Sequence, residues 1–507
     1  MERDFDVIVV GSGAAGLSAA IEAREAGATV MMIEADTHLG GATRNSTGVV
    51  YAVGTSTQAE DGVKDTPDAF YDYIMTLNQY AVKPAMMRRY ADESANMLEW
   101  LKDKGVEFPA NMLVHSDVSG IRRGHTSNTF GLGLADALIN RAGAIGVESA
   151  LGTRIDALIV EDGRVTGIRA GETELRAFSV VLATGGFGNN PEMLKKWFPS
   201  AAYHGDRTWA VHRDAPFILG DGITLGESVG AQITGYDHGL IQPTPCFDSR
   251  HVEAFLPPWL IAVNREGKRF MAEWDSYAVV GYLINEQTDR RCWAIFDHPA
   301  LVANGDDLSY ADPYNSGLAT SSWEERTIVG EVAKGVAKRA DTIVNLARQV
   351  GLDPEAVEET VRVYNRDIDE HGEDCAFRKD GNGHPLTAIK TAPFYAVEVR
   401  PAIVGFTAAG LDVDVECHVL DTKGRVIPGL FSAGEVVGSF HGKRYGGGGM
   451  SIGSAVIFWR DAGRLAAQEA LSQAASMLAQ KLGRSAQGPR ERGPIKAALA
   501  RPEGYQE

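Results

Sequence analysis

The stretch DFDVIVVGSGAAGLSAAIEAREAGATVMMIEAD, residues 4–36, contains the unit on which the rest of the fold is built. The apolar, β-branched run 7–10 is typical of a strand buried on both faces. A helix is expected over 14–26 and a second strand over 28–33. Because strand, helix and strand follow one another so closely, we predict an α/β fold of the Rossmann type.

The turn between this first strand and helix carries the pattern G-x-G-x-x-G, at Gly11, Gly13 and Gly16. The first glycine permits a sharp turn, the second lets a pyrophosphate approach the backbone, and the third lets the helix pack closely on the strand. Glu34 follows the second strand, where a carboxylate can bind both hydroxyls of an adenosine ribose. This stretch therefore predicts dinucleotide binding, and it leaves open whether the dinucleotide is FAD or NAD.

Composition narrows the classes of protein and partner. A chain of 507 residues is long for one core, so two domains are expected. The net charge of −18 argues against nucleic acid and anionic membranes as partners. No apolar run approaches the roughly 20 residues that span a bilayer. A strand so close to Met1 leaves no room for a signal peptide, and the four scattered cysteines form no metal motif, so we expect a cytoplasmic protein without a metal.

Other segments extend the dinucleotide pattern. LGGATRNSTGVV, residues 39–50, is rich in glycine and small polar residues, and it is expected to contact the cofactor. A third buried strand over 180–182 leads into a second glycine turn, Ala183 to Gly186, where a ligand could lie close to the backbone. The glycine run 446–449 precedes a helix expected from about Ser451, whose free backbone N–H groups stabilise anionic oxygen.

Between these segments the character of the chain changes. A helical pattern over 66–105 indicates packing. The following glycine-containing segment crowds together His115, Arg122, Arg123 and His125, which suggests either a pocket wall or structural packing. Prolines, tryptophans and polar loops from about 237 indicate an inserted domain. The expected division is a first part of the dinucleotide-binding domain at 1–236, an inserted domain at 237–390, a second part of the dinucleotide-binding domain at 391–470 and a C-terminal tail at 471–507.

Four blocks of the chain together resemble the flavoprotein family of fumarate reductases, succinate dehydrogenase flavoproteins and 3-ketosteroid dehydrogenases. The blocks are GSGAAG with Glu34, LGGATRNSTG, ATGGFG, and GLFSAGEVVG followed by HGKRYGGGG. The resemblance covers about residues 4–470 and implies FAD as cofactor, with the inserted α+β domain capping the flavin. It implies cofactor contacts from Gly11, Gly13, Ala15, Gly16, Glu34, Ala35, Gly41, Ala42, Thr43, Ser46, Thr47, Gly48, Ala183, Thr184, Gly185, Gly434, Glu435, Ser451 and Ile452.

The catalytic positions resemble those of 3-ketosteroid Δ1-dehydrogenases more than those of fumarate reductases. Tyr277 stands where fumarate reductases carry an arginine proton donor, and Phe406 stands where they carry a substrate histidine. The spacing R-F-x-x-E-x-x-x-Y of the dehydrogenases ends here at Tyr277, and their Y-P-G-x-G-G-T-I-G block aligns with YGGGGMSIG from Tyr445. The resemblance implies that Tyr277 removes a proton, that Tyr445 and the N–H of Gly449 hold a ketone oxygen, and that flavin N5 takes a hydride.

The expected activity is thus an FAD-dependent desaturase that introduces a double bond next to a ketone on a cyclic substrate. A further tyrosine that assists the base in that family has no clear match here. A free tyrosine has a pKa of about 10, so the base would need a neighbouring cation, such as Arg444 or His125, or an alkaline optimum.

The substrate could be a small oxo-ring acid such as 4-oxocyclohexanecarboxylate, or a 3-oxosteroid in a broad apolar pocket. Arg444, which matches a substrate arginine of fumarate reductases, favours the acid, with Arg123 and His125 as further candidates. Equally, Arg444 could form a structural ion pair. An electron acceptor (oxygen, a quinone or a dye) is expected. The rival functions are a fumarate-type reductase of an unsaturated acid and a non-catalytic flavin-binding module.

Overall fold

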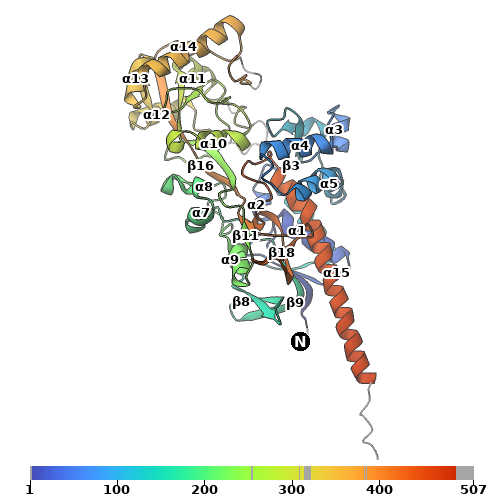
Figure 1. Ribbon diagram of the computed structural model, residues 1–507. Helices are drawn as coiled ribbons and strands as arrows, with labels where there is room; N and C mark the ends of the chain where they lie inside the picture. The colour runs from blue at the N-terminus through green and yellow to red at the C-terminus, as the bar shows by residue number, and fades with distance from the viewer. Residues whose placement is uncertain are drawn as a thin grey trace, which may run out of the picture.

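The computed structural model describes residues 3–252, 255–307, 309–312, 321–381, 383 and 385–486 (Figure 1). Its largest sheet joins strands from both ends of the chain, because β1 pairs in parallel with β9 and β9 pairs in parallel with β19. The α/β fold assembled from both chain ends is therefore confirmed. In order, the sheet contains β18 (His418–Leu420), β19 (Val426–Ser432), β9 (Thr173–Leu182), β1 (Phe5–Val10), β2 (Val30–Ile33) and β6 (Glu148–Ala150), with β7 (Ala157–Glu161) and β8 (Arg164–Ala170) attached through β9.

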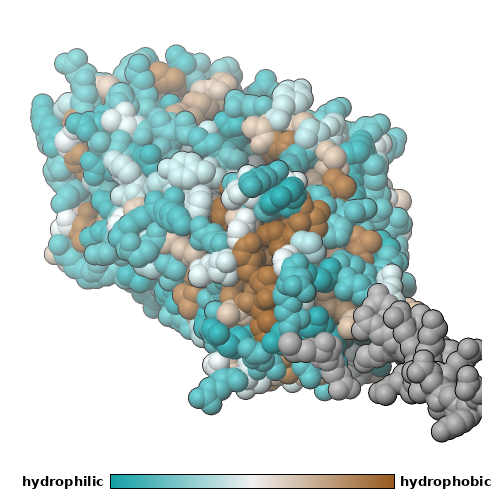
Figure 2. All heavy atoms as spheres, turned by 60° about the horizontal axis from the view of Figure 1, so that its bottom comes forward, coloured by the Kyte–Doolittle hydropathy of each residue, from teal (hydrophilic) through white to brown (hydrophobic). Residues whose placement is uncertain are grey.

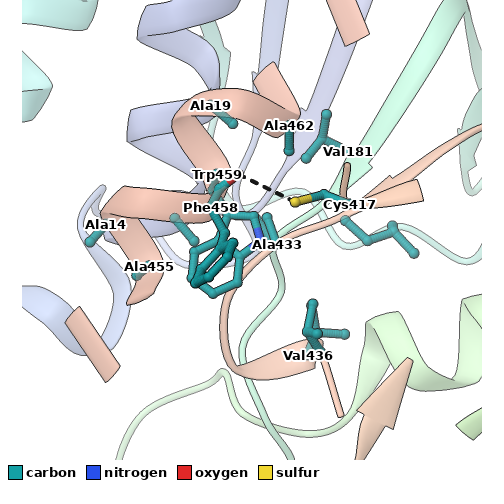
Figure 3. Close-up of a cluster of buried hydrophobic side chains, with 14 of the residues drawn as sticks. Ala14, Ala19, Val181, Cys417, Ala433, Val436, Ala455, Phe458, Trp459 and Ala462 are labelled. Carbon is teal, nitrogen blue, oxygen red and sulfur yellow. Dashed lines mark hydrogen bonds between the residues drawn. The ribbon is translucent and has the colours of Figure 1, made fainter. Parts of the chain in front are cut away.

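Helix α1 (Ala14–Glu25) ends just before Gly27, whose φ of +98° lets the chain turn towards β2. It packs against α15 (Met450–Ala486), the helix that the glycine run precedes. Figure 3 shows this core, where side chains of α1, β9 and α15 meet around Phe458 and Trp459. The Trp459 indole donates a hydrogen bond to the carbonyl of Ser432 (3.0 Å). The two ends of the chain are thus held together by one apolar core.

The second sheet belongs to the inserted domain, at the upper left of Figure 1. Its long central strand, β16 (Phe394–Thr407), lies beyond the expected boundary at residue 390, so the second sheet takes in more of the chain than was expected. The exact domain boundaries remain a prediction. The sheet contains β10 (Trp209–Ala210), β16, β14 (Cys292–Asp297) and β13 (Ile261–Val263), with β12 (Gly239–Pro245) and β15 (Lys338–Ala340) also paired to β16.

Helices cover the second sheet, and the last of them has a side-chain cap. Asp353 caps α14, accepting hydrogen bonds from the backbone N–H of Glu355 (3.0 Å) and of Ala356. The helices are α10 (Tyr277–Asn285), α11 (His298–Asn304), α12 (Glu325–Ala333), α13 (Ile343–Gln349) and α14 (Pro354–His371).

The remaining elements surround the main sheet. The turn at Asp162 and Gly163 has positive φ at both residues and joins β7 to β8. Gly220 is the N-cap of α9 (Asp221–Ser228), and the Asp221 carboxylate pairs with Arg154. The other elements are α2 (Gly41–Arg44), β3 (Val49–Tyr51), α3 (Ser56–Glu60), α4 (Pro67–Leu77), α5 (Pro84–Asp103), β4 (Leu113–His115), β5 (Arg122–Thr126), α6 (Phe130–Ala144), α7 (Pro191–Trp197), α8 (Pro199–Ala202), β11 (Ile233–Thr234) and β17 (Gly410–Leu411).

The C-terminal helix is longer than expected. The sequence suggested a tail from residue 471, whereas α15 continues to Ala486 and projects past the rest of the fold in Figure 1; residues 487–507 lie outside the described part of the chain. Figure 2 shows a mostly hydrophilic face that carries one compact hydrophobic area. Within the described ranges, no helix is long and apolar enough to cross a membrane.

Candidate active site

A cavity of about 820 Å³ lies between the carboxyl ends of β1, β2, β9 and β19 and the inserted sheet. This volume is large for a small-molecule site. Open parallel sheets bind ligands at this edge, where the strands end and helices begin. Because the lining also includes Leu240, Phe406 and Tyr277, the inserted domain forms part of the same cavity.

Two glycines shape the dinucleotide end of the cavity. Gly11 has a φ of +104°, and a Cβ at this position would lie 2.2 Å from the carbonyl oxygen of Ala183. A Cβ on Gly16 would lie 1.9 Å from the carbonyl oxygen of Gly11. Helix α1 can therefore pack this close to the turn after β1 only because residue 16 is glycine. The Thr43 hydroxyl accepts a hydrogen bond from the backbone N–H of Ala14 (3.1 Å), which fixes the first turn of α1. The backbone therefore forms a cradle of the kind that pyrophosphate needs.

Glu34 is buried beside this cradle. Its Oε2 accepts hydrogen bonds from the N–H (2.8 Å) and hydroxyl (2.5 Å) of Ser12, and its Oε1 accepts one from the N–H of Asp36 (2.9 Å). Each carboxylate oxygen has further lone-pair capacity for a ribose hydroxyl. The residues at this end of the cavity thus fit the adenosine half of FAD.

Most of the predicted cofactor residues line the cavity. Gly48 does not, because it packs against the backbone of Phe130, where a Cβ would lie 2.3 Å from a carbonyl carbon; Gly16 also faces protein. Those that line it are Gly11, Gly13, Ala15, Glu34, Ala35, Gly41, Ala42, Thr43, Ser46, Thr47, Ala183, Thr184, Gly185, Gly434, Glu435, Ser451 and Ile452. Burial raises the pKa of Glu435, and hydrogen bonds from Thr407 to its carboxylate oppose that shift.

Tyr277, Tyr445 and Gly449 all line the same cavity. Tyr277 is the first residue of α10, and its ring meets that of Phe255 edge-on at 5.5 Å. It packs against the small apolar cluster of Phe255 and Val49, and the carbonyl oxygen of Val49 lies 2.5 Å from where a Cβ of Gly449 would be. Val49 therefore lies beside both residues. Their catalytic roles remain predictions.

The loop that carries Tyr445 and Gly449 is braced from α4 and from the segment after β4. Tyr73 donates a hydrogen bond to the carbonyl of Gly446 (2.9 Å), and the N–H of Gly448 donates to the carbonyl of Ser116 (2.8 Å). Gly449 has a φ of +90°, and its N–H has no hydrogen-bond acceptor within the described part of the chain. A fixed, unpaired donor at the cavity wall can hold an oxygen of a ligand.

The expected substrate cations Arg444, Arg123 and His125 do not line the cavity, which favours a structural role for them. The Arg444 guanidinium donates to the hydroxyl of Tyr282 (2.8 Å) and to the carbonyl of Leu77 (3.1 Å), and it stacks over the Tyr282 ring at 4.4 Å. It does not line the cavity. Arg444 therefore holds the inserted domain against α4, through a cation–π contact and hydrogen bonds rather than the ion pair that was considered.

Arg123 and His125 also have structural partners and do not line this cavity, which favours structural packing over a pocket wall for residues 115–138. Arg123 is fully buried and forms a bidentate ion pair with Asp65 (2.7 and 2.9 Å). His125 contacts the Thr55 hydroxyl (2.8 Å), and burial lowers the pKa of its imidazole to about 4. Strand β5 places both side chains outside the cavity. Arg122 pairs with Asp61, and His115 is exposed.

The sequence did not point to His441, which lines the cavity. Burial lowers the pKa of its imidazole to about 3, so the ring is neutral. Its ring meets Phe406 edge-on at 4.6 Å and lies 5.3 Å from the ring of Tyr445. His441 begins the HGKRYGGGG block, and that position was the only signal available.

The cavity has little positive charge. Among the described lining residues, Arg154 is the one Arg or Lys, and it pairs with Asp221 near the Glu34 end. The segments 253–254 and 313–320, next to lining residues in sequence, contain no Lys or Arg. The other charged lining residues in the described ranges are acidic; they are Glu34, Asp36, Asp214, Asp221, Asp312 and Glu435.

Comparison with known proteins shows what this chain is similar to. The chain is 31% identical over 476 residues to a fumarate reductase (cytochrome) of Shewanella frigidimarina, covering 92% of this chain and 76% of the relative. It is 29% identical to a 3-oxosteroid 1-dehydrogenase of Mycolicibacterium smegmatis, covering 94% and 98%. Its fold matches a 3-ketosteroid-Δ4-(5α)-dehydrogenase of Rhodococcus jostii RHA1 solved with 4-androstene-3,17-dione, at 26% identity with a TM-score of 0.75, covering 92% and 98%.

The glycine cradle, the buried Glu34 beside it and the second sheet across the cavity are features of a dinucleotide-binding protein. Residues 6–451 match the FAD binding domain family, and the chain belongs to that family. The protein binds FAD and is an FAD-dependent oxidoreductase related to fumarate reductases and 3-ketosteroid dehydrogenases, as the four sequence blocks predicted.

Proposed function

We propose that this protein is a ketone desaturase, which introduces a carbon–carbon double bond next to the carbonyl of a neutral cyclic ketone. The observation that carries the proposal is that Tyr277, Tyr445 and Gly449 line one cavity. Bound FAD supplies the acceptor for the hydride that leaves the β-carbon. The protein itself must remove the α-proton and stabilise the charge that develops on the ketone oxygen.

Tyr445 and Gly449 would hold that oxygen. An α C–H is too weak an acid until its carbonyl oxygen can carry enolate charge. One fixed donor at such an oxygen typically contributes about 2.7–4 kcal/mol of transition-state stabilisation. The unpaired N–H of Gly449 and the hydroxyl of Tyr445 are two such donors on the loop braced by Tyr73 and Ser116.

Tyr277 would act as the base. The expected cationic helpers, Arg444 and His125, do not line the cavity and are bonded to other residues. Tyr277 instead occupies the first position of α10, and the N-terminus of a helix favours negative charge. That location suits a phenol that must act as a phenolate when it takes the α-proton.

The distribution of charge supports a neutral substrate. The cations that favoured an oxo-ring acid are engaged elsewhere, and the one cationic lining side chain in the described ranges, Arg154, lies at the Glu34 end and pairs with Asp221. Burying a carboxylate without a partner costs far more than burying an uncharged ring. A neutral cyclohexanone or a 3-oxosteroid is therefore favoured over 4-oxocyclohexanecarboxylate.

The same observation weakens the rival function, reduction of a fumarate-like acid. That reaction needs cations for two carboxylates, whereas Tyr277 and Phe406 occupy the corresponding positions here. In the proposed desaturase reaction, an electron acceptor such as oxygen, a quinone or a dye would reoxidise the reduced flavin.

Anaerobic mixing of the oxidised holoenzyme with ketones tests the proposal. Cyclohexanone or a 3-oxosteroid should bleach the flavin absorbance, and 4-oxocyclohexanecarboxylate should do so poorly. Reoxidation of the reduced enzyme by fumarate, together with no bleaching by any ketone, would establish the reductase instead. A protein that neither bleaches nor reoxidises with any compound of the panel would be a flavin-binding module without this chemistry.

A further inference from the structure

The two parts of the proposed catalytic site come from different domains, and one carbonyl oxygen connects them. The Ser116 carbonyl oxygen accepts a hydrogen bond from the N–H of Gly448 (2.8 Å), in the loop that carries Tyr445 and Gly449. It also accepts one from the hydroxyl of Ser276 (3.3 Å), the residue before Tyr277. Both sides of the site are thus hydrogen-bonded to a single atom.

Ser276 also fixes the start of the helix that carries Tyr277. It is the N-cap of α10, and its hydroxyl oxygen accepts a hydrogen bond from the N–H of Ala278 (3.3 Å). The hydroxyl proton goes to Ser116, so one side chain uses both of its hydrogen-bonding functions here. Only 8% of Ser276 is exposed, so water cannot readily replace either bond.

Ser116 is itself held firmly. It is buried, and it precedes Asp117, whose carboxylate accepts hydrogen bonds from the Tyr51 hydroxyl and from the N–H of Ser119 (2.6 Å). Gly447 packs against the same place, since a Cβ on it would lie 3.1 Å from the Ser116 carbonyl oxygen. The shared acceptor therefore belongs to a well-packed part of the FAD domain.

We propose that Ser276 is a positioning residue, which sets the inserted domain at the distance and angle where Tyr277 faces the donors Tyr445 and Gly449. This inference rests on the proposed function, because it assigns the purpose of the contact to that reaction. Small misplacements of a reacting group are costly, and about 1 Å can reduce a rate by roughly 100-fold. A hydrogen bond from each catalytic segment to one fixed atom limits such misplacement.

The test compares Ser276→Ala with Ser276→Thr and with a matched control. Thr keeps the hydroxyl and its capping ability, whereas Ala loses both. Ser94→Ala is the control, because the Ser94 hydroxyl also donates to a backbone carbonyl, that of Tyr90 (2.8 Å), from a fully buried position that does not line the cavity.

Stopped-flow flavin reduction at saturating ketone should be about 10- to 100-fold slower in Ser276→Ala, with little change in the ketone concentration for half-maximal rate. FAD content should remain at the wild-type level, and Ser276→Thr and Ser94→Ala should reduce near the wild-type rate. Flavin reduction at the wild-type rate in Ser276→Ala would overturn the positioning role of Ser276. An equally slow rate in Ser276→Thr would overturn it as well.

Hydrogen–deuterium exchange separates this inference from the proposed reaction. In Ser276→Ala, amides of peptides covering 113–120 and 440–455 should exchange faster than in the wild type, and those of Ser94→Ala should not. If no ketone reduces the wild-type flavin, the proposed function fails, while faster exchange would still establish the link between the domains. Unchanged exchange in both peptides would overturn that link whatever the reaction is.

Discussion

Tyr445 and Ser451 are hydrogen-bonded to each other twice. The phenolic oxygen of Tyr445 accepts a hydrogen bond from the backbone N–H of Ser451 (2.8 Å), and its proton is donated to the Ser451 hydroxyl (3.1 Å). The phenol is therefore held at the N-terminus of α15, where the helix dipole makes its O–H a stronger donor. A ketone oxygen needs only to replace the Ser451 hydroxyl as the acceptor of that proton.

The Tyr445→Phe variant tests this arrangement. Without the phenolic donor, we expect flavin reduction by ketone to slow by about 10²–10³-fold, because one oxyanion donor is lost. FAD should still bind. Ser451→Ala, which leaves the phenol and the backbone N–H in place, should have a much smaller effect on the rate. Equal losses in the two variants would show that the Tyr445 hydroxyl has no direct contact with substrate.

The pH dependence of Tyr445 should be visible in both activity and stability. Burial raises the pKa of Tyr445 to about 12, although hydrogen bonds from Ser451 oppose the shift. The hydroxyl should therefore remain a donor past pH 10. An unfolded tyrosine ionises near pH 10, so the stabilising contribution is complete below that pH and is lost as the pH rises towards 12. The free energy of unfolding of the wild type should fall relative to Tyr445→Phe above pH 10; parallel curves would contradict this.

Tyr277→Phe should remove the base and leave the binding site in place. General bases typically contribute roughly 10²–10⁴-fold to a rate, so flavin reduction should slow by that factor while ketone still perturbs the flavin spectrum on binding. Anaerobic stopped-flow absorbance measures both effects. Normal reduction by this variant would eliminate Tyr277 as the base.

Arg444→Met should lower the stability of the protein but should not change how it discriminates between neutral and charged substrates. The guanidinium stacks on Tyr282 and is bonded to the carbonyl of Leu77, so its loss should lower the melting temperature. The KM values for neutral and carboxylate-bearing ketones should stay as in the wild type, because Arg444 does not line the cavity. A selective increase of KM for the carboxylate would show that Arg444 reaches the substrate.

Glu34→Gln should weaken FAD binding. Hydrogen bonds to a charged group contribute about 1.5–3 kcal/mol, so the dissociation constant for FAD should rise by at least about tenfold. Titration of the apoprotein with FAD, followed by flavin fluorescence, measures the change. Asp36→Asn is a suitable control, because Asp36 lines the cavity next to Glu34 but only its backbone N–H contacts the Glu34 carboxylate. Equal affinities of the wild type and Glu34→Gln for FAD would show that Glu34 does not bind the ribose.

The sequence by itself determined the cofactor half of this protein. The spacing of Gly11, Gly13 and Glu34 depends on one strand, one turn and one helix, which are local in the chain, and the structure has them as expected. That residues 180–182 and 430–432 belong to the same unit was predictable for a similar reason, since each apolar strand ends in its own glycine turn; in the structure β9 lies between β1 and β19 and pairs with both. Tyr277, Tyr445 and Gly449 were found by motif spacing, and the cavity includes all three.

Only the tertiary structure decided which of the nearby polar residues face that cavity. His125 and Arg123 belong to a glycine-containing, loop-like sequence, yet β5 places them in the protein interior. There Arg123 pairs with Asp65, and His125 is hydrogen-bonded to Thr55. Arg444 precedes a cavity residue but points the other way, onto Tyr282. Side-chain direction depends on partners that are remote in sequence, such as Asp65 for Arg123 and Tyr282 for Arg444. The contact of Ser276 with Ser116, and with it the alignment of the two domains, could be seen only once the chain was folded.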